Sequence, residues 1–151
     1  MALLIAIAGV IGTMLFTYNG FSLLFPLIVS VKYLIGFIAT IEIGAIIVNE
    51  IAVAFIPQRS FGSNYKLVLY SFTPFMVAMV ITRLFSSLVF INFAGLYGIY
   101  IAWRGVQILT DSAPSFRLRY TLLVSLATLV IYMAVFYILN AIHEGIYFAY
   151  T

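Results

Sequence analysis

Long runs of apolar residues, separated by short polar segments, dominate the chain. Five such runs cover about residues 2–17, 28–56, 65–84, 86–109 and 118–140. Each run is continuous, whereas the strands of a membrane barrel show short segments in which polar and apolar residues alternate. Runs of about 20 apolar residues match the length of a helix that crosses a bilayer. The pattern therefore predicts an all-α integral membrane protein, in which residues 1–151 form one domain, a five-helix transmembrane bundle.

Prolines mark the ends of two runs and interrupt a third. Pro57 closes the second run, and a polar loop at residues 110–114 separates the fourth run from the fifth. Pro74 lies inside the third run, where it removes a backbone donor and predicts a helix kink. We expect the hydroxyl of Thr73 or a neighbouring helix to satisfy the carbonyl of Tyr70, which loses its helical donor.

The composition agrees with this class and excludes several kinds of chemistry. Hydrophobic residues make up 66% of the chain and charged residues 7%, against about 45–50% and about 25% in soluble domains. The chain has no cysteine, which excludes disulfides and thiolate chemistry. Its only histidine, His143, has Glu144 beside it, but adjacent side chains on a helix do not converge, so the two make a poor metal site. We therefore expect no catalytic residue, no metal and no cofactor.

Charged residues are few and lie near the ends of the apolar runs. They do not cluster as a nucleic-acid-binding face requires, so we expect the lipid bilayer and other membrane proteins as partners. Basic residues are enriched on the cytoplasmic side of membrane proteins. Five spans would place seven basic residues in two groups: Arg59, Lys66, Arg104, Arg117 and Arg119 on one side, Lys32 and Arg83 on the other. This division predicts a cytoplasmic amino terminus and an outside carboxyl terminus.

Glu42 is the polar residue nearest the middle of a predicted span. An acidic side chain at the centre of a membrane helix costs about 2.5–3.5 kcal/mol on insertion scales. One interpretation is a proton or cation relay, or a contact inside a larger assembly. The other is a protonated, hydrogen-bonded carboxyl that faces neighbouring helices. Tyr97 and Tyr100 in the fourth span match its depth, so we expect either hydroxyl to be its donor.

Two further features of the second run predict contacts between helices. Glu50 lies near the cytoplasmic end of this run, at the depth of Arg104 in the fourth, and the two predict a buried ion pair. Gly36, Thr40 and Gly44 recur every four residues on one face, which is a signal of close helix packing in membranes.

Motifs in the middle of the chain resemble those of the Yip family, membrane proteins that interact with Rab-type GTPases. Tyr70, Thr73 and Pro74 match its tyrosine-x-x-threonine-proline element, and the segment Gly95–Leu96–Tyr97–Gly98–Ile99–Tyr100 matches its glycine- and tyrosine-rich fourth helix. The resemblance covers residues 41–139 and is greater to the bacterial branch, which points to a bacterial inner membrane. It implies five spans and a cytoplasmic amino terminus. The segment 102–107 departs from the family pattern.

Two hypotheses about function follow. The first is a non-catalytic, Yip-like membrane protein that packs against other membrane proteins as an adaptor or accessory subunit. The second is a small transporter or channel, built by homo-oligomerisation around Glu42. The chain offers almost no soluble mass for partner recognition, so a partner would meet it inside the bilayer or at two short loops. This consideration favours the first hypothesis.

Overall fold

A computed structural model describes residues 2–16, 24–56, 60–109 and 114–149 of the chain. Its helices are α1 (Ala2–Phe16), α2 (Leu24–Ala52), α3 (Phe61–Leu84), η1 (Ser86–Leu96), α4 (Tyr97–Leu109) and α5 (Pro114–Ala149). The segment η1 is a 3₁₀-helix that leads directly into α4. The described residues contain no strand, so the all-α class is confirmed for them.

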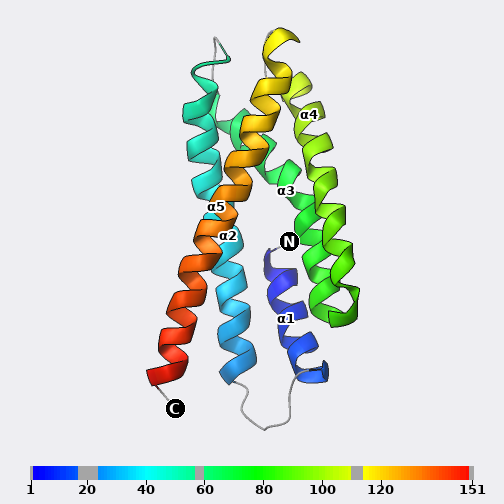
Figure 1. Ribbon diagram of the computed structural model, residues 1–151, viewed down its shortest axis with the longest axis vertical. Coiled ribbons are helices and arrows are strands. Elements are labelled where there is room, and N and C mark those ends of the chain that lie inside the picture. Colours follow the sequence, from blue (N-terminus) through cyan, green and yellow to red (C-terminus); the bar gives the residue numbers. More distant parts are fainter. Residues whose placement is uncertain (1, 17–23, 57–59, 110–113, 150–151) are drawn as a thin grey trace.

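The long helices stand side by side and alternate in direction along the chain (Figure 1). α2 packs against α1, α3 and α5, whereas α4 packs against η1, α3 and α5. α3 and α5 therefore lie between α2 and α4. α1 lies beside the lower half of the bundle in Figure 1.

Four helical segments are long and apolar enough to cross a membrane. They are Leu27–Ala52, Phe61–Leu84, Ser87–Leu109 and Ser115–Gly145. α1 has 15 residues and its apolar part, Ala2–Gly12, is shorter than these four. A crossing by this first helix stays a prediction, because a helix needs about 17 residues or more to span the hydrocarbon core.

The fourth and fifth helices differ from their expected form. α5 begins at Pro114 and ends at Ala149, so it extends beyond both ends of the fifth apolar run at about residues 118–140. The 3₁₀ segment η1 covers 11 residues and is divided by a kink; continuous 3₁₀-helices rarely exceed three or four residues. Leu88 within it has a non-helical backbone. Apolar patterning alone predicts a plain α-helix here, since both helix types bury the same kinds of residue.

Aromatic rings fill the interior between the lower halves of the helices. The ring of Phe37 on α2 is fully buried and lies 5.4 Å from that of Phe136, 5.9 Å from Phe72 and 6.1 Å from Tyr132, measured between centroids. These separations are typical of favourable aromatic pairs. A second buried cluster occupies the upper half and consists of Val48, Ala52, Ile56, Leu67, Val68, Val106, Tyr120 and Val124. The two clusters together form the core of the bundle.

The small residues of α2 lie at its contacts with two other helices. A Cβ atom added to Gly36 would come within 2.7 Å of the Phe136 ring of α5, and one added to Gly44 would lie 3.3 Å from Val68 of α3. The Thr40 hydroxyl is buried and donates a hydrogen bond of 2.7 Å to the carbonyl of Gly36. This stripe therefore faces the interior of the bundle.

Pro74 lies inside α3, which continues on both sides of it. The Thr73 hydroxyl donates to the carbonyl of Leu69 at 2.8 Å, one residue before the carbonyl that the proline deprives of its donor. Thr73 thus bonds to its own helix, but at a different carbonyl from the one expected. The kink at Pro74 and the donor to Tyr70 stay predictions.

Candidate functional site

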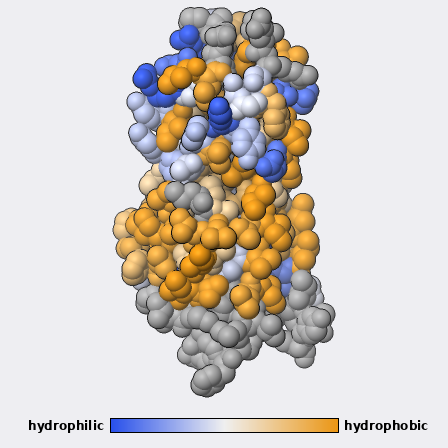
Figure 2. Space-filling model, turned by 180° about the vertical axis from the view of Figure 1, so that it is seen from behind, coloured by the Kyte–Doolittle hydropathy of each residue, from blue (hydrophilic) through white to orange (hydrophobic). Residues whose placement is uncertain are grey.

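Charged residues mark two levels on the bundle, with an apolar belt between them. Lys32 and Glu50 are 18 residues apart on α2, roughly 27 Å at 1.5 Å per residue. Lys66 and Arg83 on α3 are separated by a similar length, roughly 26 Å. Both lengths are close to the thickness of a bilayer's hydrocarbon core, about 30 Å. Figure 2 shows a broad hydrophobic surface below an upper end where most hydrophilic residues gather.

The described cations are divided between the two ends as the sequence predicts. Lys66 at the start of α3, Arg104 near the end of α4, and Arg117 and Arg119 at the start of α5 belong to the upper end in Figure 1. Lys32 and Arg83 belong to the lower end. Arg59 lies outside the described residues. The structure thus separates the charges along the bundle axis, whichever side of a membrane each end occupies.

Glu42 lies near the middle of the apolar belt and on its outer surface. It is ten residues from Lys32 and eight from Glu50, so it is within a few ångströms of the mid-plane, at about 1.5 Å per residue. Its side chain is exposed, and its partner among the described residues is the Tyr65 hydroxyl of α3, which donates to Oε1 at 3.0 Å. Within the described part of the chain, the bond from Tyr65 to Oε1 is the one that holds this exposed carboxyl. The chain thus leaves part of a mid-plane carboxyl uncovered.

The donor to Glu42 is a tyrosine, as expected, but it belongs to α3. Tyr97 and Tyr100, whose depth predicts this role, are both exposed on α4 and lie against each other with ring centroids 5.3 Å apart. The physical reason is the order of the helices around the bundle, because α3 is a neighbour of α2 and α4 is not. Depth can be inferred from sequence, whereas neighbours around a bundle cannot.

Glu50 and Arg104 are both exposed. The Arg104 guanidinium donates to the side-chain oxygen of Gln107 at 3.2 Å, one turn along its own helix. Since α3 and α5 separate α2 from α4, the arrangement gives no direct support to the pair. An ion pair between Glu50 and Arg104 stays a prediction.

A buried polar cluster ties three helices together near the upper end, and it has no counterpart in the sequence-based predictions. The Tyr120 hydroxyl of α5 donates to Asn64 Oδ1 of α3 at 3.0 Å, and Asn64 Nδ2 donates to Asn49 Oδ1 of α2 at 3.1 Å. Asn64 is 1% exposed. The sequence places Asn64 in a loop, because Pro57, Gly62 and several polar residues surround it. The signal available in the sequence was Asn64 itself, a polar residue directly before the third apolar run, which the structure places one turn inside α3.

The described residues show no cluster typical of a metal centre. Within them, no group of three or more His, Cys, Asp or Glu side chains is placed to hold a metal ion. Together they define an all-helical bundle with four helices long and apolar enough to cross a membrane. No family model, curated protein or solved structure matches the chain. The resemblance to the Yip family therefore stays a prediction that rests on the quoted motifs.

Proposed function

We propose that the protein is a non-catalytic, multi-pass membrane protein of Yip-like type that acts as an adaptor or accessory subunit. In this proposal it packs against another membrane protein through the outer face of α2 and α3. The observation that carries the proposal is the exposed carboxyl of Glu42 at the middle of the apolar belt. Ionisable residues at this depth almost always face protein or a water-filled cavity, because exposure to lipid is costly.

The surroundings of Glu42 fit a helix–helix interface. Ile38 and Ile46 lie one turn away on either side and are 49% and 55% exposed, so the polar pair Glu42–Tyr65 sits in an apolar strip along α2. A partner helix that carries a serine, threonine, asparagine or glutamine would donate to the free carboxyl oxygen. Such hydrogen bonds between membrane helices contribute about 0.6–2 kcal/mol each. Apolar packing on both sides would supply the remaining affinity.

The proposal includes the orientation of the chain in a bacterial inner membrane. The end with Lys66, Arg104, Arg117 and Arg119 would face the cytoplasm, and the carboxyl terminus would lie outside. A cytoplasmic amino terminus further requires that α1, which lies beside the lower half of the bundle, crosses the membrane. The chain has no cysteine, so Ser63→Cys near the start of α3 and Gly145→Cys near the end of α5 can be labelled singly. A membrane-impermeant thiol reagent should modify Gly145→Cys in intact cells and miss Ser63→Cys. The reverse pattern would refute this orientation.

A second candidate is an oligomeric transporter or channel that uses Glu42. The same exposed carboxyl favours it, because two or more copies that meet through α2 and α3 would bring their Glu42 side chains to one interface. Proton transfer needs an ionisable group, whereas packing needs only hydrogen bonds. If the protein is a transporter or channel, Glu42→Gln should therefore abolish transport. If it is an adaptor or accessory subunit, Glu42→Gln should preserve its assembly with the partner.

Gentle detergent extraction followed by mass spectrometry tests the proposed function. We expect a second membrane protein to co-purify at constant stoichiometry with the wild type and with Glu42→Gln, since glutamine keeps the hydrogen-bonding geometry. With Glu42→Leu, most of the co-purifying membrane protein should be lost. A lone oligomer of this chain would support the transporter instead. A monomer for all three forms would contradict both candidates.

A further inference from the structure

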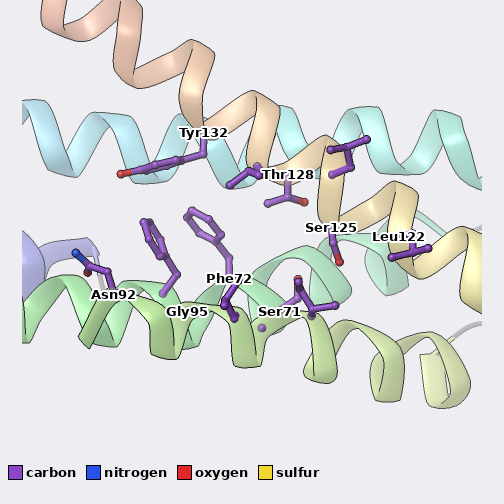
Figure 3. A pocket seen from close by; sticks show the side chains of 14 residues that line it. Ser71, Phe72, Asn92, Gly95, Leu122, Ser125, Thr128 and Tyr132 are labelled. Carbon is purple, nitrogen blue, oxygen red and sulfur yellow. The ribbon is translucent and has the colours of Figure 1, made fainter. Parts of the chain in front are cut away.

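A cavity of about 370 Å³ lies between α3, η1, α4 and α5 (Figure 3). Its walls are mostly apolar and include the rings of Phe72, Phe75 and Tyr132. Phe72 is at the middle of α3, and Leu129 of the opposite wall is near the middle of α5. The cavity thus lies at the depth of the apolar belt. No residue of α2 lines it, so it is separate from the Glu42–Tyr65 pair.

The volume and the mostly apolar lining of this space are within the range of small-molecule sites. Small-molecule sites are typically about 300–1,000 Å³, mostly apolar, with a few placed polar groups. Packing voids in protein interiors are seldom larger than a water molecule. The cavity exists because α5 diverges from α3, with which it makes few contacts. A space of this size within the belt would be accessible to molecules dissolved in lipid.

The Ser125 hydroxyl differs from those of Ser71 and Thr128, which also line the cavity. The Ser71 hydroxyl donates to the carbonyl of Val68 at 3.0 Å, and the Thr128 hydroxyl donates to that of Val124 at 2.8 Å. The Ser125 oxygen is buried and makes no hydrogen bond within the described chain. Figure 3 shows it pointing away from α5 into the cavity, on the side of Ser71. A buried donor without an acceptor is costly, so Ser125 marks the place where a ligand acceptor would be stabilised.

We propose that this cavity binds a lipid-soluble molecule with a flat, apolar body and a carbonyl oxygen that accepts from Ser125. The flat body would pack on Phe72, Phe75 and Tyr132, whose rings favour stacked or edge contacts with other rings. A saturated acyl chain has no acceptor and no flat surface, so it would leave Ser125 without a partner. This cavity lies apart from the proposed interface, because no residue of α2 lines it.

Benzophenone is a suitable probe, because it has two flat rings and one carbonyl and forms a covalent adduct under ultraviolet light. The full chain in lipid nanodiscs should be labelled saturably, with adducts in the segments 71–75 and 122–132. Unlabelled benzophenone should compete with the labelled probe for the cavity. Diphenylmethane, which lacks the carbonyl, should compete with the probe more weakly. Ser125→Ala should weaken the apparent affinity for benzophenone roughly two- to tenfold, the loss of one hydrogen bond. Equal competition by diphenylmethane, or an unchanged affinity of Ser125→Ala, would overturn the proposed recognition.

A cavity-filling variant tests the location. Ser125→Phe should abolish saturable labelling, because its ring would occupy the space into which Ser125 points. Val130→Phe is the matched control, since Val130 is exposed on the same helix and does not line the cavity. It should be labelled like the wild type. Saturable labelling of Ser125→Phe at the same residues, or unsaturable labelling spread over all helices of the wild type, would refute the site.

Discussion

Among the hydrogen bonds that join α2 to α3, two near the middle and upper end of the bundle differ in what surrounds them. Asn49 and Asn64 meet at 3.1 Å inside the bundle, where Tyr120 of α5 completes the cluster. Glu42 and Tyr65 meet at 3.0 Å on the outer face. The two contacts are of similar length and involve the same two helices, yet one is enclosed by this chain and the other is open.

The difference separates a structural role from an interaction role. In the inner cluster the asparagine side chains find partners within the chain, so its contribution to stability needs nothing else. At the outer pair the carboxyl is only partly satisfied, at a depth where lipid offers no hydrogen bonds. Loss of the inner contact should therefore affect folding, and loss of the outer contact should affect association.

The largest expected effect is that of Asn64→Leu. This nearly isosteric change leaves the Tyr120 hydroxyl and the Asn49 amide without their partner, and each buried unsatisfied group costs about 1–3 kcal/mol. We expect a loss of about 3 kcal/mol in the free energy of unfolding, measured by chemical denaturation in detergent. Tyr65→Phe is the control at the outer pair. An equal loss in both variants would remove the distinction between the two contacts.

The same contrast between inside and outside applies to two glycines. A Cβ on Gly98 of α4 would collide with the carbonyl oxygen of Ser71, whereas one on Gly145 of α5 would meet nothing within 4 Å. Gly98→Ala should destabilise the bundle by about 2 kcal/mol through overpacking against backbone. Gly145→Ala should be neutral or stabilise α5 by up to about 1 kcal/mol, because alanine favours helix. The thermal midpoints of the two variants in one detergent give the comparison, and similar values would contradict it.

The smallest expected effect on folding is at the outer pair itself. Glu42→Leu removes an exposed carboxyl and one exposed hydrogen bond, so the free energy of unfolding of the isolated chain should change by less than about 1 kcal/mol. Its association should nevertheless be lost. A large destabilisation of the monomer would instead assign Glu42 a structural role, that of a hydrogen-bonded carboxyl that faces neighbouring helices.

The elements of this bundle could be predicted from the sequence better than their arrangement. Continuous apolar runs specify helices wherever the backbone must satisfy its own hydrogen bonds, and the depth of Glu42 follows from its distance to Lys32 and Glu50. The outward direction of Glu42 does not follow, because both the lipid side and the protein side of a membrane helix are apolar. Nor does the choice of Tyr65 as donor, which depends on the order of helices around the bundle.

The cavity and the 3₁₀ segment lay beyond prediction for a related reason. The residues of η1 are apolar and would suit an α-helix equally well, so their backbone form depends on tertiary packing. Ser125 looks like any other membrane serine in the sequence. In the structure its hydroxyl makes no hydrogen bond within the described chain, whereas Thr121 and Thr128 on the same helix donate to carbonyls four residues earlier.

The most direct test of the central claim is photo-crosslinking from the outer face in living cells. A photoreactive diazirine amino acid at Ile46, one turn from Glu42, would be compared with the same residue at Val130 on α5; the two positions are 55% and 54% exposed. The account predicts a discrete protein adduct from Ile46 that disappears with Glu42→Leu, and only lipid adducts from Val130. Lipid adducts alone from Ile46, or a protein adduct that Glu42→Leu leaves unchanged, would contradict it.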